Sequence, residues 1–270
     1  MSDAYVTHVL LETVGQPEGL YGRRKMTAHL RRQGIEVSAG TVHRLMGDDG
    51  LNGLVRGRSH RTTIPAKDGI RAGDLVNRKF TAPCPNRVWV AYCTYCRTWN
   101  GFVYVAFIID VFSRMIVGWH AVLTQTSRPT ELITVPLRMA LWQRSHQIKE
   151  TGEKLIHHSD AGSKYVSFRF TEDLMLEGIL ASIGTVGDAY DNALAESTIG
   201  LFKNEVMAKN NPFHVGPFKT IADVENATVY WVDWYNNTRL HSSIGDVPSA
   251  EFELNYYATN LASQPQMSHT

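Results

Sequence analysis

Long hydrophobic runs are missing from this chain of 270 residues, and no stretch reaches the roughly 18 apolar residues of a membrane-spanning helix. Residues 1–20 lack the cationic start and the small-residue cleavage site of a secretory signal. Cysteine is scarce as well, because only Cys84, Cys93 and Cys96 are present. They are too few for a disulfide framework, and no further pair completes a four-ligand zinc site. We therefore predict a soluble cytoplasmic protein with ordinary thiols.

Net charge is also nearly absent, at +1, but its distribution is uneven. Residues 1–80 carry 13 Lys and Arg against 8 Asp and Glu, whereas residues 81–270 carry 14 against 18. Residues 23–61 alone hold nine cations against three acids. Such a basic front is typical of a polyanion-binding module, although a solvated basic helix face has the same composition.

Two short helices are predicted in this basic region. Residues 23–34 end on a glycine, and Ser38 is a suitable N-cap for a helix over 39–46. Together they form a helix-turn-helix-like unit that would present Thr41, His43 and Arg44 to a DNA groove. Other cations on or beside the first helix are expected to contact phosphates: Arg23, Arg24, Lys25, Arg31 and Arg32.

The remainder alternates between strand and helix patterns and predicts a mixed α/β sheet. Strands are expected over 87–95, 102–110, 115–123, 154–158 and 179–183, and helices over 130–143, 168–178, 188–208 and 221–235. Trp231 and Trp234 in the last helix suit either packing or base stacking. The predicted divisions are an N-terminal segment 1–16, a helix-turn-helix-like domain 17–55, a basic linker 56–80, a catalytic core 81–250 and a C-terminal tail 251–270.

Two acids, Asp160 and Glu196, are separated by 35 residues, and their spacing favours a divalent-metal site for phosphoryl transfer on DNA. Asp160 follows a predicted strand and Glu196 lies in a predicted helix, so folding could bring both to one ion. Asn192, Glu196 and Lys203 share one face of that helix. Solvated surface acids and an exposed polar stripe are the alternative interpretation.

Several motifs, taken in order from Leu20 to Phe252, resemble bacterial insertion-sequence transposases of the IS-three type, in their second-reading-frame product. They are Tyr21-Gly22-Arg23-Arg24, Trp89-Val90-Ala91, Ile109-Asp110-Val111-Phe112-Ser113-Arg114, His158-Ser159-Asp160-Ala161-Gly162-Ser163, the segment from Gly187 to Glu196, Lys203, and Tyr235-Asn236-Asn237-Thr238-Arg239-Leu240-His241.

The resemblance implies an RNase H-like integrase core, a mixed five-stranded sheet with flanking helices, in which three acids hold two Mg²⁺ or Mn²⁺ ions. Such enzymes cleave insertion-sequence ends and join them to new DNA. Asp160 and Glu196 match the second and third acids, and Lys203 matches a cation that contacts the transposon end. The implied partners are DNA carrying the terminal inverted repeats, target DNA, the upstream-frame transposase product and further copies of the chain on DNA.

The first acid is missing from the motif. Where the family reads Trp-Val-Ala-Asp, this chain reads Trp89-Val90-Ala91-Tyr92, and a neutral phenol cannot bridge two cations as a carboxylate does. Asp110, on the neighbouring strand, is either structural or a substitute ligand, and Lys164 adds a cation where glutamine is usual. We therefore expect either a transposase subunit with impaired catalysis or an inactive copy that only binds DNA or assembles. A nuclease unrelated to mobile DNA fits the basic front less well.

Overall fold

The computed structural model describes residues 2–54, 75–76, 80–123, 131–151, 154–159, 174–175, 177–183, 193–208 and 211–262. Four short elements form the N-terminal module: α1 (Asp3–Glu12), η1 (Pro17–Leu20), α2 (Arg23–Arg32) and α3 (Ala39–Asp48). The two predicted helices are confirmed as α2 and α3, and the Ser38 side chain caps α3 by accepting from the Thr41 N–H at 3.0 Å. Helix α1 was not predicted, and its Val6 and Leu10 are buried in the core.

A five-stranded sheet forms the second part of the molecule. Its strands are β1 (Val88–Thr98), β2 (Gly101–Asp110), β3 (Ile116–Leu123), β4 (Ile156–Ser159) and β5 (Leu180–Ile183), in the spatial order β3-β2-β1-β4-β5. Strands β1, β2 and β3 are antiparallel, while β4 runs parallel to β1 and β5 parallel to β4. The predicted mixed sheet is thus confirmed.

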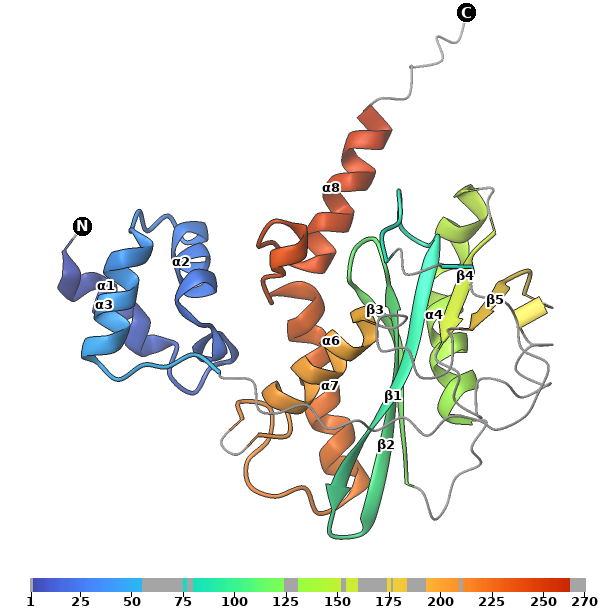
Figure 1. Cartoon of the computed structure of the whole chain (residues 1–270), viewed down its shortest axis with the longest axis horizontal. Helices are drawn as coiled ribbons and strands as arrows, with labels where there is room; N and C mark the ends of the chain where they lie inside the picture. The colour runs from blue at the N-terminus through green and yellow to red at the C-terminus, as the bar shows by residue number, and fades with distance from the viewer. Residues whose placement is uncertain are drawn as a thin grey trace, which may run out of the picture.

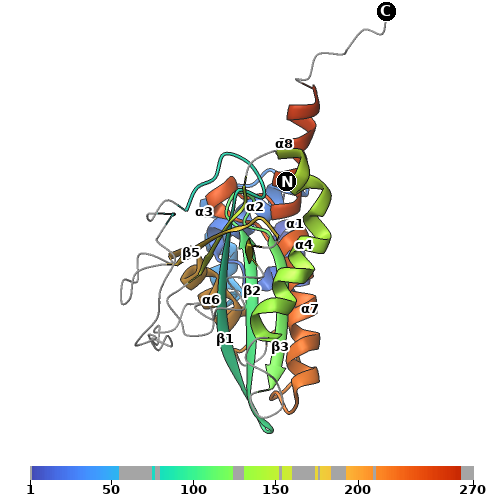
Figure 2. The ribbon, with the colours of Figure 1, turned by 90° about the vertical axis from the view of Figure 1, so that its right-hand side faces the viewer.

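Helices cover both faces of the sheet (Figures 1 and 2). Helix α4 (Glu131–Thr151) packs on the face that includes Trp89 and Ile108. Helices α6 (Ala193–Glu205) and α7 (Ile221–Asn237) contribute to the core on the opposite face, which includes Tyr92. The helix predicted over 168–178 falls mostly outside the described residues. No helix in the described part of the chain is long and apolar enough to span a membrane.

Part of the predicted C-terminal tail, residues 251–270, forms a helix. Beyond η3 (Ser242–Ile244), residues 249–262 form helix α8 (Ser249–Ala262). Glu253 of α8 is buried and forms an ion pair with Arg144 of α4, and Phe112 packs against the ring of Tyr256. These long-range contacts hold the segment helical, and local sequence patterns could not reveal them.

The N-terminal module packs on the core through Tyr21. Its ring stacks on Trp234 of α7 with centroids 5.9 Å apart, and its hydroxyl accepts from the Leu240 N–H at 3.0 Å. Trp234 in turn donates from Nε1 to Glu18 at 2.9 Å. Two motifs far apart in the sequence therefore meet at one contact. Both Trp231 and Trp234 are buried, so the packing interpretation of these tryptophans is correct.

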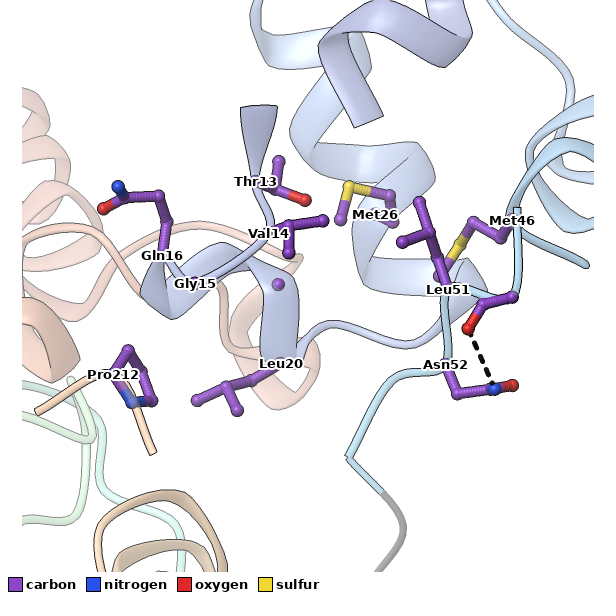
Figure 3. Close-up of a pocket in the computed structure, with 12 residues that line it drawn as sticks. Thr13, Val14, Gly15, Gln16, Leu20, Met26, Met46, Leu51, Asn52 and Pro212 are labelled. Carbon is purple, nitrogen blue, oxygen red and sulfur yellow. Dashed lines mark hydrogen bonds between the residues drawn. The ribbon is translucent and has the colours of Figure 1, made fainter. Parts of the chain in front are cut away.

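A cavity of about 220 Å³ is lined by Leu20 and other residues of the N-terminal module (Figure 3). Residues of the module line most of it, and Pro212 of the core completes it. No charged or titratable side chain is among its lining residues, so it offers no general acid or base.

Candidate active site and nucleic-acid interface

Tyr92 occupies the middle of β1 and faces α6 and α7. It pairs across the strands with Phe107 and stacks on that ring, with centroids 5.4 Å apart and an angle of 26°. Only 1% of its surface is exposed. Its hydroxyl is buried without a well-formed hydrogen bond among the described residues, and burial raises its pKa well above the ordinary value. Tyr92 is therefore a neutral core side chain.

Helix α6 carries the two described candidates for DNA chemistry. Glu196 lies exposed in its first turn, and Lys203 lies two turns later with Nζ 5.4 Å from the centre of the Tyr95 ring. Partial burial lowers the pKa of Lys203, and the nearby Cys96 opposes that shift. Asn192 falls outside the described residues.

The second predicted acid, Asp160, also lies outside the described residues, as does Lys164. Strand β4 ends at Ser159, which pairs with Ala91 in parallel register. In the sequence, Tyr92 comes directly after Ala91 and Asp160 comes directly after Ser159. The closeness of Asp160 to Glu196 stays a prediction. Among the described residues no group of three or more His, Cys, Asp or Glu side chains could hold a metal ion.

Asp110 is engaged in structure. Its buried carboxylate accepts from the backbone N–H groups of Asn86 at 2.7 Å and of Phe112 and Ser113 at 2.9 Å. Burial raises the pKa of Asp110, while the hydrogen bonds oppose that shift. These bonds fix the turn between β2 and β3, so the described geometry favours the structural interpretation over a substitute metal ligand.

The motif from Tyr235 to His241 holds α6 and the sheet edge in place. Arg239 pairs with Glu205 at the end of α6 at 2.7 Å, with both side chains 5% exposed, and Trp231 donates to the same carboxylate at 2.9 Å. Asn236 brackets Ile116 of β3 by accepting from its N–H and donating to its carbonyl, each at 2.9 Å. Glu205 was not among the predicted functional residues. Its position between apolar Phe202 and Val206 was the available signal, since an acid there needs a buried partner.

The cations predicted to bind DNA differ in their surroundings. Arg31 donates to the Val37 carbonyl, Arg32 pairs with Glu251, and Arg44 pairs with Asp3 and Asp48. Lys25 has its Nζ 5.7 Å from the centre of the Tyr21 ring.

Arg23 and Arg24 are exposed in the first turn of α2, and within the described residues their side chains form no ion pair. Gly22, the N-cap, gives this turn no side-chain hydrogen bond. Cations at a helix N-terminus oppose the helix dipole, typically by about 0.3–1 kcal/mol each at exposed sites. A bound phosphate would reverse that effect.

Comparison with protein families gives three matches. Residues 82–189 and 177–248 match two integrase core domain families, and residues 11–59 match an HTH-like domain family.

Curated relatives carry transposase names. The transposase for insertion sequence element IS629 of Shigella sonnei is 49% identical over 240 residues, covering 89% of this chain and 76% of the relative. The transposase for IS904 of Lactococcus lactis is 32% identical over 239 residues, covering 87% and 88%. Transposase InsF for IS3A of Escherichia coli is 28% identical over 247 residues, covering 91% and 81%.

Solved structures show weaker similarity. A simian T-cell lymphotropic virus intasome in complex with PP2A regulatory subunit B56 gamma covers 92% of this chain, and 72% of that chain is covered, at 16% identity and a TM-score of 0.48. The HTLV-2 integrase catalytic core domain in complex with magnesium covers 63% of this chain, and 98% of that core is covered, at 18% identity and a TM-score of 0.42. The fold assignment rests on the family matches and the sheet topology.

Proposed function

Because the chain belongs to the insertion-sequence transposases of the IS-three type, with an integrase core and an HTH-like domain, we propose that it cleaves and joins insertion-sequence ends with impaired efficiency. The observation that supports the impairment is the buried, neutral Tyr92, which stands where the family motif has its first acid. Glu196 is exposed on the helix that Tyr92 faces, and Asp160 follows the strand paired with β1.

These residues fit one divalent cation better than two. Glu196 and Asp160 would supply carboxylate oxygens, which Mg²⁺ and Mn²⁺ prefer, whereas a buried phenol is a poor ligand for either ion. When bound, the cation would stabilise negative charge on the reacting phosphate. The chain's own residues would position the DNA, with Lys203 holding a backbone phosphate two helical turns from Glu196.

The direct test of this proposal is a nicking and strand-transfer assay with Mg²⁺ or Mn²⁺ on candidate insertion-sequence ends. We expect weak activity in the parent chain, and Asp160→Asn or Glu196→Gln should abolish it. Weak activity that survives both substitutions would remove Asp160 and Glu196 from the catalytic site.

A second candidate function, favoured by the same buried Tyr92, is binding and assembly without catalysis. An inactive copy would still occupy insertion-sequence ends. Its expected result in the same assay is no activity above the Asp160→Asn background together with retained DNA binding.

For both candidate functions the proposed partners are DNA with terminal inverted repeats, target DNA, the upstream-frame product and further copies of the chain. The proposed location is the cytoplasm, on the nucleoid when the protein is bound to DNA.

For the N-terminal module we predict binding to DNA mainly through phosphates. Replacing Arg23 and Arg24 with alanine should weaken binding and flatten the dependence of log affinity on log salt by about 0.9 units for each phosphate that the variant no longer neutralises. The measurement is a fluorescence-anisotropy titration at several salt concentrations.

Arg138→Ala with Lys154→Ala is the matched control, because both cations are exposed and one lies on α4, across the sheet from α6 and α7. This pair removes the same charge from another part of the molecule. Equal slopes for the two double variants would exclude Arg23 and Arg24 from the interface.

A further inference from the structure

The hairpin of β1 and β2 extends beyond the helices that cover the sheet and ends beside the loop before α7 (Figures 1 and 2). Near its end three large aromatic side chains remain exposed: Tyr95 by 37%, Phe102 by 48% and Trp99 by 71%. Tyr95 and Phe102 contact edge to face, with ring centroids 5.4 Å apart. Single exposed apolar residues are ordinary, but three on one hairpin form a patch.

Cations accompany these rings. Lys203 of α6 lies 5.4 Å from the centre of the Tyr95 ring, and Lys219 lies 5.3 Å from that of Trp99. Arg97 is exposed opposite Phe102 in the register of the two strands. We call these six residues, Tyr95, Arg97, Trp99, Phe102, Lys203 and Lys219, the hairpin surface.

Two acids lie close in sequence to residues of the hairpin surface, Glu205 and Asp223, and Glu205 is paired with Arg239. The Asp223 carboxylate accepts from the backbone N–H groups of Lys219 and Thr220, each at 2.8 Å, as part of the cap of α7. The negative charge of Asp223 therefore interacts with the N-terminus of α7. The hairpin surface combines aromatic faces with positive charge.

The hairpin end is fixed rather than hanging freely. The N–H groups of Trp99 and Asn100 donate to the carbonyls of Phe218 and Lys219, each at 3.2 Å. Thr98 Oγ1 donates to the Gly101 carbonyl at 2.8 Å, and Gly101 has a φ of 116°, which favours glycine. A surface held in this way loses little entropy when a ligand binds.

We propose that the hairpin surface is a stacking platform for unpaired bases of a single DNA strand next to the end held at α6. The inference rests on the proposed function and adds the strandedness of the DNA. Aromatic rings accept any base, and neighbouring cations follow the backbone. Bases within a duplex have no free faces, so exposed rings select for unpaired ones.

The position of Lys203 joins this platform to the candidate active site. Glu196 and Lys203 are seven residues apart on α6, or about 10 Å along the helix axis. A strand that contacts Lys203 would thus reach Glu196 within a few nucleotides. The aromatic faces then meet bases that flank the reacting phosphate.

The test compares a blunt DNA duplex with the same duplex carrying a five-thymine 3′ or 5′ overhang, by fluorescence anisotropy with the full chain. One of the overhangs should tighten binding to the parent by about 5- to 150-fold per stacked base. Trp99→Leu and Phe102→Leu keep apolar bulk but remove the rings, and both should lose this gain. Trp142→Leu on α4 is the matched control, because Trp142 is 82% exposed, and it should keep the gain.

Blunt-duplex binding without an overhang gain would overturn the platform and leave the proposed function standing, whereas no binding to any DNA would contradict both. A Trp99→Leu variant that changes the oligomeric state in sedimentation but not the overhang gain would assign the surface to a protein contact and overturn the inference. If Trp99→Leu does not fold by circular dichroism, Phe102→Leu and Trp99→Phe carry the test. Trp99→Phe should keep most of the gain.

Discussion

Tyr92→Asp is expected to raise Mg²⁺-dependent cleavage or joining of insertion-sequence-end DNA by orders of magnitude over the parent chain. The physical reason is charge. The parent has a buried phenol whose raised pKa keeps it neutral. Aspartate would instead place a carboxylate at position 92, directly after Ala91, and Ala91 is the residue of β1 that pairs with Ser159 of β4. Asp160 follows Ser159, so two acids would stand on neighbouring strands.

The same substitution should destabilise the fold. Tyr92 stacks on Phe107, which in turn contacts Phe202 with centroids 5.1 Å apart, so removing its ring leaves a gap under α6. Truncating a buried aromatic side chain typically costs about 3–5 kcal/mol. The assay should therefore run beside a urea titration and below the unfolding transition of the variant.

Tyr92→Asn is the matched control for this gain, because it removes the same ring without adding an anionic ligand. It should lose comparable stability and stay inactive, and Asp160→Asn added to Tyr92→Asp should abolish the gain. If the parent were as active as Tyr92→Asp, another carboxylate would already complete the site and the impairment proposal would have to be dropped. Asp110 is a poor candidate for that carboxylate, since its oxygens already accept hydrogen bonds from three backbone N–H groups.

Local signals predicted much of the fold. The glycine stop of α2 and the Ser38 cap of α3 each operate within a few residues, and both appear where expected. Helix α7 begins with a capping box of Thr220 and Asp223, a purely local device. Such elements need no knowledge of tertiary contacts.

The missed features depend on partners that are distant in sequence. Helix α8 is anchored by Glu253 on Arg144, separated by 109 positions, and the module docks through Tyr21 on Leu240, separated by 219. A single sequence does not show which distant residues will meet. The order of the motifs pointed to the candidate site but did not show that Tyr92 is fully buried. Both faces of β1 are buried because α4 covers one face and α6 and α7 cover the other.

A second large loss of stability is expected at the buried pair of Glu205 and Arg239. Their contact joins the end of α6 to the segment after α7, and both side chains are 5% exposed. Removing one partner leaves the other charge buried and uncompensated, which typically costs about 3–5 kcal/mol. Glu205→Gln should therefore lower the free energy of unfolding by that amount in a urea titration.

An exposed ion pair provides the control for this last prediction. Arg32 and Glu251 join the module to α8 with side chains 39% and 37% exposed, and such pairs contribute about 0–1 kcal/mol. Glu251→Gln should thus change stability far less than Glu205→Gln, and equal losses would contradict the role given to burial. Combining Glu205→Gln with Arg239→Met should recover part of the loss, because the double variant leaves no unpaired charge in the core. Since Glu205 ends the helix that carries Glu196 and Lys203, the single variant should also weaken DNA binding through Lys203 before it unfolds.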